Sequence, residues 1–148
     1  MAISPLNQGA EAWVQVGMGH LVGVQSTLAE LSRRIGTEQP PSAQGLTLHA
    51  NGIQGFLPSE RKGAIALLSQ AMAPLPAHER IGLVQALAIA LPHVPGAHLK
   101  EAFKTVMDAA RELPTSQPGV LDLRQGLAQQ HPELAAEWLE ARAGKRAR

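Results

Sequence analysis

The sequence has no cysteine and no tyrosine, and aromatic residues fill only 3% of its 148 positions. Without cysteine the chain has no disulfide bonds, thiol nucleophiles or cysteine-bound metals, which is typical of a protein in a reducing compartment. No stretch approaches the roughly 18 consecutive apolar residues of a membrane-spanning helix. The first residues lack the basic region and the apolar core of a cleaved signal peptide. We therefore expect a soluble, cytoplasmic protein without a membrane partner.

An excess of charge of one sign is also lacking, because 13 basic and 12 acidic residues leave a net charge of +1. These charges are mixed along the chain, so they do not create the broad positive field that non-specific binding to nucleic acid requires. The main basic cluster is the C-terminal tail, residues 144–148. We expect this tail to fray and to aid solubility; contact with nucleic acid or with an acidic partner is the alternative.

Alanine and leucine, by contrast, are abundant, and both favour helices because they lose little side-chain freedom there. Hydrophobic residues make up 45% of the chain, a normal fraction for a folded globular protein. The length suits one domain with a substantial core and is too short for two ordinary ones. These features predict a single all-α domain.

Apolar residues repeat every 19 positions between Leu57 and Pro114. Each copy has four members at spacing i, i+3, i+7 and i+10, which places them on one face of a helix. A proline follows the last member of each copy, at positions 76, 95 and 114, and predicts that the helices end at equivalent places. The three copies are Ile65, Leu68, Met72 and Leu75; Val84, Leu87, Leu91 and Val94; and Phe103, Val106, Ala110 and Leu113.

A fourth, weaker copy precedes these three and consists of Leu46, His49, Ile53 and Phe56. The same stretch contains Asn51-Gly52, a pair that favours a two-residue β-hairpin turn. We favour a short helix, because an isolated two-stranded hairpin is only marginally stable. The hairpin is the alternative.

Before the repeat, the sequence predicts a long helix over residues 10–36, with a heptad-like apolar stripe from Val14 to Ile35. Arg33 and Arg34 fall in its last turn, where cations suit the helix dipole, and Gly36 fits the position just after the helix. Glycines at positions 17, 19 and 23 predict a bend or a break, since each costs about 0.5–1 kcal/mol relative to alanine.

The repeat predicts helices over 59–73, 77–91 and 96–112, with Ser59 as the N-cap of the first. Beyond Pro114 the register is lost, and two more helices are predicted over 119–129 and 132–143. The predicted organisation is a flexible arm (1–9), a single all-α domain (10–143) and a basic tail (144–148). Within the domain, the long N-terminal helix (10–36) is followed by a linker (37–45), the repeats (46–114) and the C-terminal helices (115–143).

One helix per copy of the repeat gives one helix pair for every two copies, and the length of such a pair falls within the range of TPR, HEAT and armadillo units. Neither the Trp-Leu-Gly-Tyr pattern of TPR units nor the Thr-Pro-Leu-His pattern of ankyrin units is present. We therefore predict a small helical-repeat array of α-hairpins, HEAT- or armadillo-like, or a bundle, with about five to six helices.

The pattern of Leu-Pro, a few residues, Arg, an Ala/Leu-rich helix and Leu-Pro again resembles repeats in the SKWP/XopAD-like type III effectors of plant-pathogenic bacteria. The matching residues are Leu75-Pro76-Ala-His-Glu-Arg80 with Leu87 to Pro92, and Ala102-Phe103 with Ala109 to Pro114. The resemblance covers less than half of the chain; those effectors are much larger and their units are somewhat longer. It implies a bacterial interaction protein with a role in virulence, secreted into host cells without a cleaved signal peptide. It transfers no catalytic residue.

Candidate groups for catalysis or metal binding are few. The six histidines include no His-Glu-x-x-His motif and no histidine with a ligand-spaced pair of carboxylates. We expect His78, His93 and His98 to be exposed or to cap helices, and His49 to lie partly buried in the core. The glycines at 17, 19 and 23 lie within a helical pattern and not between a strand and a helix, as a phosphate loop would. We predict no enzyme, no catalytic residue, no cofactor and no metal.

The function that these features favour is protein–protein interaction by a non-enzymatic module. Apolar helix faces would bind another protein or a second copy, and the rim charges Arg61, Arg80 and Lys104 would orient it. Trp13 and Trp138, near opposite ends of the chain, are candidates either for caps over the core or for exposed interface anchors. The alternative function is a small nucleic-acid-associated regulator that uses the basic tail.

Overall fold

The computed structural model describes residues 26–37 and 42–147, with side chains as far as Gly144. These residues form seven α-helices and two short 3-10 helices, and their only β-type pairing is an isolated bridge between Ser26 and Phe56. The predicted all-α class is confirmed, with seven α-helices in the described ranges where about five to six were expected. The elements are α1 (Leu28–Thr37), α2 (Ala43–Asn51), η3 (Ile53–Gly55), α3 (Pro58–Ala71), α4 (Ala77–Ala90), η4 (Leu91–His93), α5 (Gly96–Glu112), α6 (Val120–Gln130) and α7 (Pro132–Ala147).

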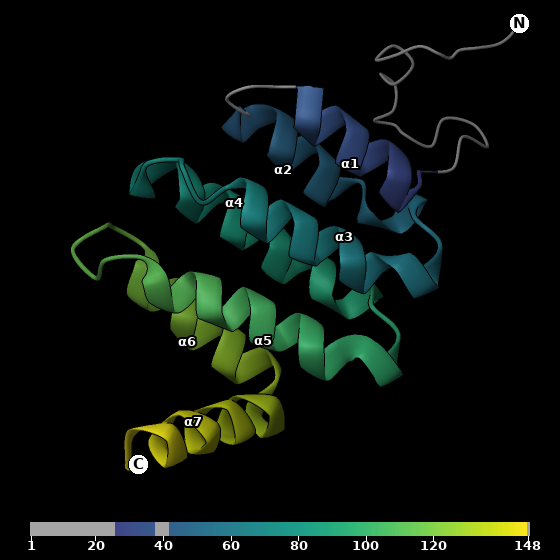
Figure 1. The fold of residues 1–148 in the computed structure, drawn as a ribbon. Helices are drawn as coiled ribbons and strands as arrows, with labels where there is room; N and C mark the ends of the chain where they lie inside the picture. Colours follow the sequence, from purple (N-terminus) through teal and green to yellow (C-terminus); the bar gives the residue numbers. More distant parts are fainter. Residues whose placement is uncertain (1–25, 38–41, 148) are drawn as a thin grey trace, which may run out of the picture.

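The helices form antiparallel pairs that stack in two layers (Figure 1). One layer contains α1, α3 and α5, and the other contains α2, α4 and α6. At the C-terminal end of the stack, α7 packs against α5 and α6. This arrangement confirms the predicted small helical array. Helices contact others of their own layer and, across the two layers, α2 packs against α3, and α5 packs against α4 and α6.

The repeat is visible in the starts of α3, α4 and α5, at residues 58, 77 and 96. The apolar sets found in the sequence face the core. All their members are buried except Leu75 and His49, which are partly exposed. Burying a large aliphatic or aromatic side chain contributes about 1.5–3 kcal/mol. These sets therefore contribute a large part of the apolar core that holds the two layers together.

Two prolines of the repeat begin helices, although the sequence predicted that they would end the preceding ones. Pro76 is the N-cap of α4 and Pro95 is the N-cap of α5, whereas α3 already ends at Ala71. Proline suits a helix start because its φ is fixed near the helical value and the N–H that it lacks would have no intrahelical acceptor there. For the same reason Pro58 opens α3. Its N-cap is Leu57, so the prediction that Ser59 is the N-cap is wrong.

The weak fourth copy of the repeat is helical, so the hairpin alternative is wrong. Ser42 caps α2, because its hydroxyl accepts a hydrogen bond from the N–H of Gly45 at 3.0 Å. The Asn51-Gly52 pair ends the helix, where the Gly52 N–H donates to carbonyls of the last turn. Since α2 begins at Ala43, the linker predicted over 37–45 is shorter than expected.

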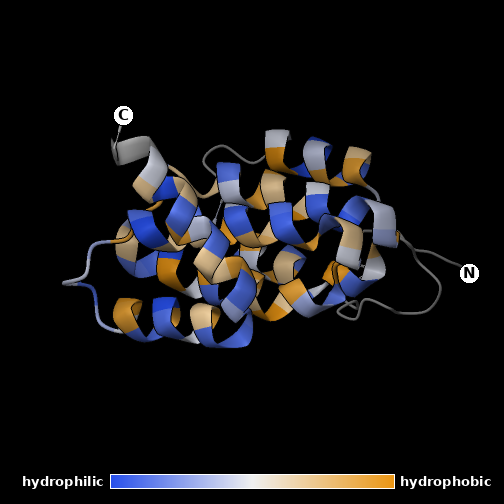
Figure 2. Cartoon of the chain, turned by 90° about the horizontal axis from the view of Figure 1, so that it is seen from below, coloured by the Kyte–Doolittle hydropathy of each residue, from blue (hydrophilic) through white to orange (hydrophobic). Residues whose placement is uncertain are grey.

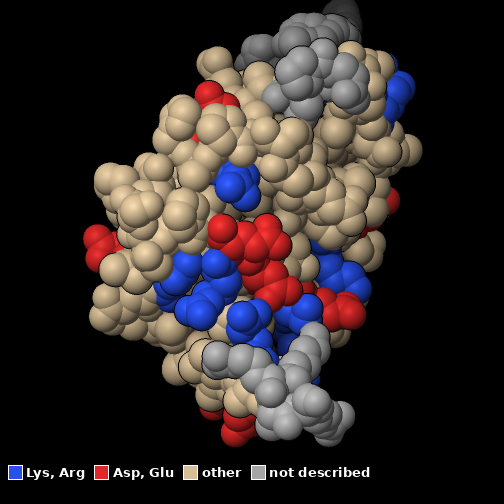
Figure 3. Space-filling model, turned by 60° about the vertical axis from the view of Figure 1, so that its left-hand side comes forward, with Lys and Arg blue, Asp and Glu red and all other residues tan. Residues whose placement is uncertain are grey.

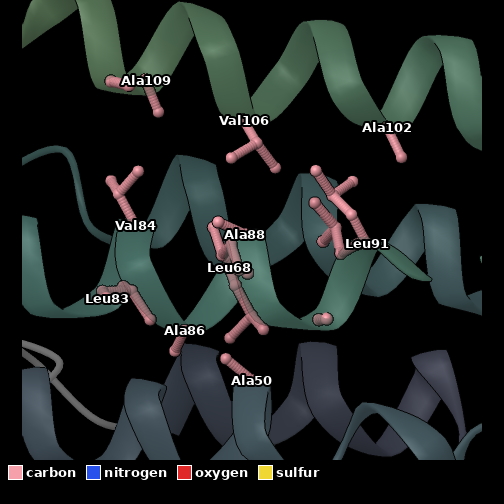
Figure 4. Packing of buried hydrophobic residues seen from close by; sticks show 14 of the residues in the cluster. Ala50, Leu68, Leu83, Val84, Ala86, Ala88, Leu91, Ala102, Val106 and Ala109 are labelled. Atoms are coloured by element: carbon pink, nitrogen blue, oxygen red, sulfur yellow. The ribbon is translucent and has the colours of Figure 1, made fainter. Parts of the chain in front are cut away.

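Helix α4 fills the space between α5 and α2, as Figure 4 shows. Val106 and Ala109 of α5 point toward α4, and Ala86 of α4 points toward Ala50 of α2. The two alanines are 6% and 1% exposed, and their small size lets α2 and α4 approach closely. Interiors are close-packed, so a larger side chain at either alanine would cost about 1–3 kcal/mol.

Most of the helices visible in Figure 2 carry both hydrophobic and hydrophilic residues. Every buried residue in the described ranges is apolar, and these residues form one core cluster. No helix in this part of the chain combines the length and the apolar composition that crossing a bilayer requires.

The N-terminal helix differs in detail from its prediction. Gly36 lies inside α1, which extends to Thr37, so Gly36 is not the residue that follows the helix. Glu30 forms ion pairs with Arg33 and Arg34, and hydrogen bonds from these two side chains lower the pKa of Glu30 to about 2. Ser26 and Thr27 are not helical, so the helix predicted over 10–36 is wrong at these two residues and begins at Leu28. Residues 10–25, with the glycines at 17, 19 and 23, lie outside the described residues.

The C-terminal helix is longer than predicted. It runs from Pro132, as expected, to Ala147, whereas fraying was expected from Gly144 onward. The residues after Gly144 include no proline, and Lys, Arg and Ala all have good helix propensity, so nothing in the sequence terminates the helix there.

Candidate functional site

Arg61, one of the predicted rim charges, is used inside the molecule. Its guanidinium donates from Nε to Phe56 O (3.1 Å), from Nη1 to His93 O (2.8 Å) and from Nη2 to Gln54 O (3.0 Å). These carbonyls lie at the ends of η3 and η4, where a helix has no N–H left to offer them. Arg61 thereby ties the first turn of α3 to both 3-10 segments, and its charge is not free to orient a partner.

Arg124 of α6 does the same for the end of α5, and it was not among the predicted site residues. It donates from Nε to Ala110 O (3.3 Å) and from Nη2 to Arg111 O (3.1 Å) and Leu113 O (2.7 Å). Burial, with the charge of Arg111 nearby, lowers the pKa of Arg124 from its ordinary value. The acceptors are backbone atoms, so no pattern of side chains in the sequence pointed to this role.

Arg80 occupies the place in α4 that Arg61 occupies in α3, yet the structure gives it no hydrogen bond or ion pair within the described residues. Its Nε is buried and has no acceptor. The side chain lines an open hollow of about 200 Å³ between the ends of α3 and α5 and the first turn of α4. The wall of the hollow also includes Ser69, Met72, Ala73, Thr105, Asp108 and Glu112.

Charged side chains gather beside this hollow, on α5 and α7. Figure 3 shows acidic and basic side chains in contact with one another on this side of the molecule. Lys104 Nζ donates to Asp108 Oδ2 (3.0 Å), and Trp138 Nε1 donates to Asp108 Oδ1 (2.8 Å). Both carboxylate oxygens of Asp108 are therefore engaged. Lys104, another predicted rim charge, is held by its own helix in an exposed pair of the kind that is worth about 0.3–0.5 kcal/mol.

Trp138 is a cap over the core and not an exposed anchor, because only 7% of its surface is accessible. The guanidinium carbons of Arg111 and Arg142 lie 5.5 and 4.8 Å from its ring centroid. Such cation–π contacts contribute about 0.5–1 kcal/mol each at exposed sites. The cluster of two arginines, the indole and Asp108 attaches α7 to α5. Trp13 lies outside the described residues.

The outer surface of α2 and α4 has a different character, since beyond the first turn of α4 it carries no charged side chain. No Lys, Arg, Asp or Glu occurs in residues 39–59 or 81–99. Ile89 is 69% exposed and Leu48 is 64% exposed, the two highest values among the large apolar side chains of the described residues. We call the exposed residues of this region the uncharged surface: Gln44, Leu48, Asn51, Gly82, Gln85 and Ile89.

Leu48 marks an open end of the layer that contains α2, α4 and α6. Two repeats later its equivalent is Ala86, which faces α2 and is 6% exposed. Since α2 is the first described helix of its layer, no described helix covers Leu48. The sequence prediction missed this surface; the signal available for it was the absence of charge over two long stretches.

The histidines are spread over the fold. No group of three or more His, Cys, Asp or Glu that could hold a metal occurs in residues 26–37 and 42–147. His78 is exposed, and His93 Nε2 lies 2.9 Å from Gln54 Nε2. His98 was expected to be exposed or capping, but it is partly buried and its Nδ1 has no partner.

His49 lies partly buried on α2, as predicted. Burial lowers the pKa of His49, the charge of Arg34 lowers it further and the charge of Glu30 opposes the shift. The imidazole therefore favours its neutral form in the folded protein.

No protein-family model matches the chain, and neither a curated protein nor a solved structure is significantly similar to it. What the molecule does has to be inferred from its own surfaces.

Proposed function

We propose that this protein is a non-enzymatic protein-interaction module and that a partner protein docks on the uncharged surface of α2 and α4. The observation that supports this proposal is the exposure of Leu48 and Ile89 within a surface that has no charge. A partner that buries these side chains gains apolar contact area without having to desolvate a charged group. The surface is formed by packed helices, so little ordering is required when a partner binds.

The partner is expected to present an amphipathic helix with an apolar, uncharged face. In the layer of α2 and α4, Ala86 is covered by a neighbouring helix, and a partner helix would cover Leu48 in the same way. Side-chain amides of Gln44, Asn51 and Gln85 provide neutral hydrogen-bond donors and acceptors around the apolar residues. A second copy of this chain and the chain's own residues 10–25 are competing occupants.

Site-specific photo-crosslinking in the native cell tests the proposal and separates the three occupants. A benzophenone side chain is placed at position 48 or 89, and the matched control is position 139 of α7, where Leu139 is 58% exposed. We expect covalent adducts with one other protein from positions 48 and 89 and not from 139. Introducing Leu48→Glu while the probe is at 89 should remove the adduct, because a carboxylate would have to be buried unpaired.

Other outcomes of this experiment have distinct meanings. An adduct of twice the chain mass identifies a second copy as the occupant, and an internal cross-link to residues 10–25 identifies the chain's own N-terminal segment. Adducts that form equally from position 139, or none from 48 and 89, would contradict docking on the uncharged surface.

A salt titration separates this proposal from the alternative of a nucleic-acid-associated regulator. Binding of duplex DNA through Arg111, Arg142 and the basic tail would weaken with salt, with a slope of about −0.9 per phosphate neutralised. Docking on the uncharged surface would depend little on salt, because no charge is screened there. A steep negative slope for binding to DNA would favour the regulator.

The resemblance to SKWP/XopAD-like repeats supports a narrower form of the proposal, in which the partner is a host protein. Delivery can be measured by fusing a calmodulin-dependent adenylate cyclase to the C-terminus and expressing the fusion in a bacterium with a functional type III secretion system. Cyclic AMP should accumulate in contacted host cells, and a secretion-deficient strain is the control. Equal signals from both strains would remove the host-cell form of the proposal.

A further inference from the structure

Three arginines approach the ends of helices in this fold, and two of them are fully used. Arg61 donates to three carbonyls at the ends of η3 and η4, and Arg124 donates to three carbonyls at the end of α5. Arg80 donates to none within the described residues, although its Nε is buried. A buried donor without an acceptor costs about 1–3 kcal/mol, and such groups are rare in folded proteins.

The repeat shows which carbonyls would correspond to the acceptors of Arg61. Arg80 lies one repeat after Arg61. Two acceptors of Arg61 are the carbonyls of Gln54 and His93. One repeat later, the equivalent carbonyls belong to Ala73 and Glu112. Ala73 and Glu112 both line the hollow around Arg80. Neither of these two carbonyls accepts a hydrogen bond from Arg80. Beside Glu112, the carbonyls of Ala110, Arg111 and Leu113 accept from Arg124 instead. Arg80 is thus held in a place built for three hydrogen bonds and makes none of them.

The charges of the hollow define the ligand that fits it. A carboxylate would gain contact with Arg80 but would approach Glu112, which forms no ion pair in the described residues. An ammonium group would pair with Glu112 but would be repelled by Arg80. A neutral group that carries both an acceptor and a donor satisfies the two residues at once. The opening, about 200 Å³, also has room for a side chain and not for a helix.

We propose that the hollow around Arg80 is a binding site for a carboxamide, the side chain of a glutamine or asparagine on a partner protein. The carboxamide oxygen accepts from the guanidinium of Arg80, whose Nε has no other acceptor, and its NH₂ donates to the carboxylate of Glu112. The apolar walls Met72 and Ala73 contact the methylene groups of the incoming side chain. This site uses residues distinct from the uncharged surface, so it stands or fails independently of docking there.

Nuclear magnetic resonance of the arginine side chains tests this site with two isosteric probes. N-acetyl-glutamine methylamide and N-acetyl-glutamate methylamide differ only in a carboxamide against a carboxylate. We expect the glutamine probe to shift the Nε–Hε signal of Arg80 saturably, with a Kd on the order of 1–10 mM. The glutamate probe should bind about tenfold more weakly because of the charge on Glu112.

The Glu112→Gln variant supplies the control for the role of charge. It removes the repulsion, so the glutamate probe should now bind at least as well as the glutamine probe. The Nε–Hε signals of Arg61 and Arg124 should stay in place throughout and report that the fold is intact. A stronger shift with glutamate in the unmodified protein would reassign the hollow as an anion site, and no saturable shift of the Arg80 signal with either probe would overturn the proposal.

Discussion

Arg61 Nη1 lies 2.8 Å from the carbonyl oxygen of His93, a residue 32 positions later in the chain. This hydrogen bond joins the first turn of α3 to the segment that follows α4, so it links consecutive units of the repeat through a side chain and not only through apolar packing. Arg80 has the same position within its unit and forms no equivalent bond. Two arginines at equivalent positions of the repeat thus have different hydrogen-bond partners.

Arg61→Met should destabilise the protein, whereas Arg80→Met should leave its stability unchanged or raise it, because the buried Nε of Arg80 has no acceptor to lose. Methionine keeps the aliphatic part of the side chain, so the difference isolates the hydrogen bonds. Loss of three charge-assisted bonds should cost about 1.5–3 kcal/mol after water has partly replaced the donors. At position 80 the substitution should cost nothing and should recover part of the roughly 1–3 kcal/mol that the unpaired buried Nε costs. Urea denaturation followed by circular dichroism measures both. Equal losses would show that the Arg61 bonds contribute nothing to stability.

Gly119→Ala and Gly126→Ala should have opposite effects, although both residues belong to or adjoin α6. Gly119, the N-cap, has φ of +90°, and an added Cβ would lie 3.2 Å from Ile81 Cδ1. Alanine there should cost about 1–2 kcal/mol. Gly126 lies inside the helix with no atom near an added Cβ, so alanine should stabilise by about 0.5–1 kcal/mol. Thermal unfolding of the parent protein and the two variants measures both effects. A rise in Tm for Gly119→Ala would contradict the positive φ assigned to Gly119.

His49→Leu should stabilise the fold and reduce its sensitivity to acid. The equivalent residues in the other units are Leu68, Leu87 and Val106, all fully buried. Because burial lowers the pKa of His49 in the folded state, the unfolded chain binds the proton more readily, and stability falls as pH decreases below about 6.5.

The measurement for His49→Leu is the free energy of unfolding between pH 8 and pH 5. The variant should gain about 0.5–2 kcal/mol at neutral pH, as consensus substitutions commonly do. Its advantage should grow on acidification. Glu30 does not affect this comparison. Its pKa is lowered from the ordinary value of 4.5 to about 2 in the folded protein, so it decreases stability only when the pH falls below about 4.5 and the carboxylate becomes protonated. Parallel pH curves for parent and variant would refute the role given to His49.

Trp138→Phe should loosen α7 without unfolding the rest of the molecule. Phenylalanine fills most of the space but cannot donate to Asp108, so the loss should be about 1–2 kcal/mol for a hydrogen bond to a charged acceptor and a weaker cation–π stack. Hydrogen exchange should accelerate in α7 and remain slow in α4. Leu139→Ala, a change at an exposed residue of the same helix, is the control. Uniform acceleration across all helices would show that α7 is not a separable end unit.

The helices could be predicted from the sequence because burial follows the helical period. The four-residue sets located α3, α4 and α5, and the bounds of α5 were predicted as 96–112, where the structure has them. Proline was misjudged because the same residue that cannot continue a helix is also well suited to begin one. The difference between Pro76 as an end and Pro76 as a start depends on where the preceding turn closes, which the pattern does not encode.

The candidate sites were harder to predict than the helices. Glu60-Arg61 and Glu79-Arg80 are the same dipeptide at the same place in the repeat, so no local pattern distinguishes the bonded arginine from the unbonded one. Arg61 reaches the carbonyls of Gln54 and His93, whereas at the end of α5 the arginine that bonds backbone carbonyls is Arg124, far beyond Arg80 in the chain. Backbone acceptors carry no side-chain signature, and their competition for donors appears only once the chain has folded.

Each repeat unit of the sequence supplies one helix, and consecutive helices belong alternately to the two layers of the stack. Loss of a single repeat unit would therefore exchange the layers for every helix that follows it. If α4 were lost, α5 would take its place, and its lysines and carboxylates would replace the neutral outer surface. Loss or gain of two adjacent units would preserve both surfaces. Lineages of this fold that keep one charged and one neutral side are thus restricted to an even number of helices gained or lost.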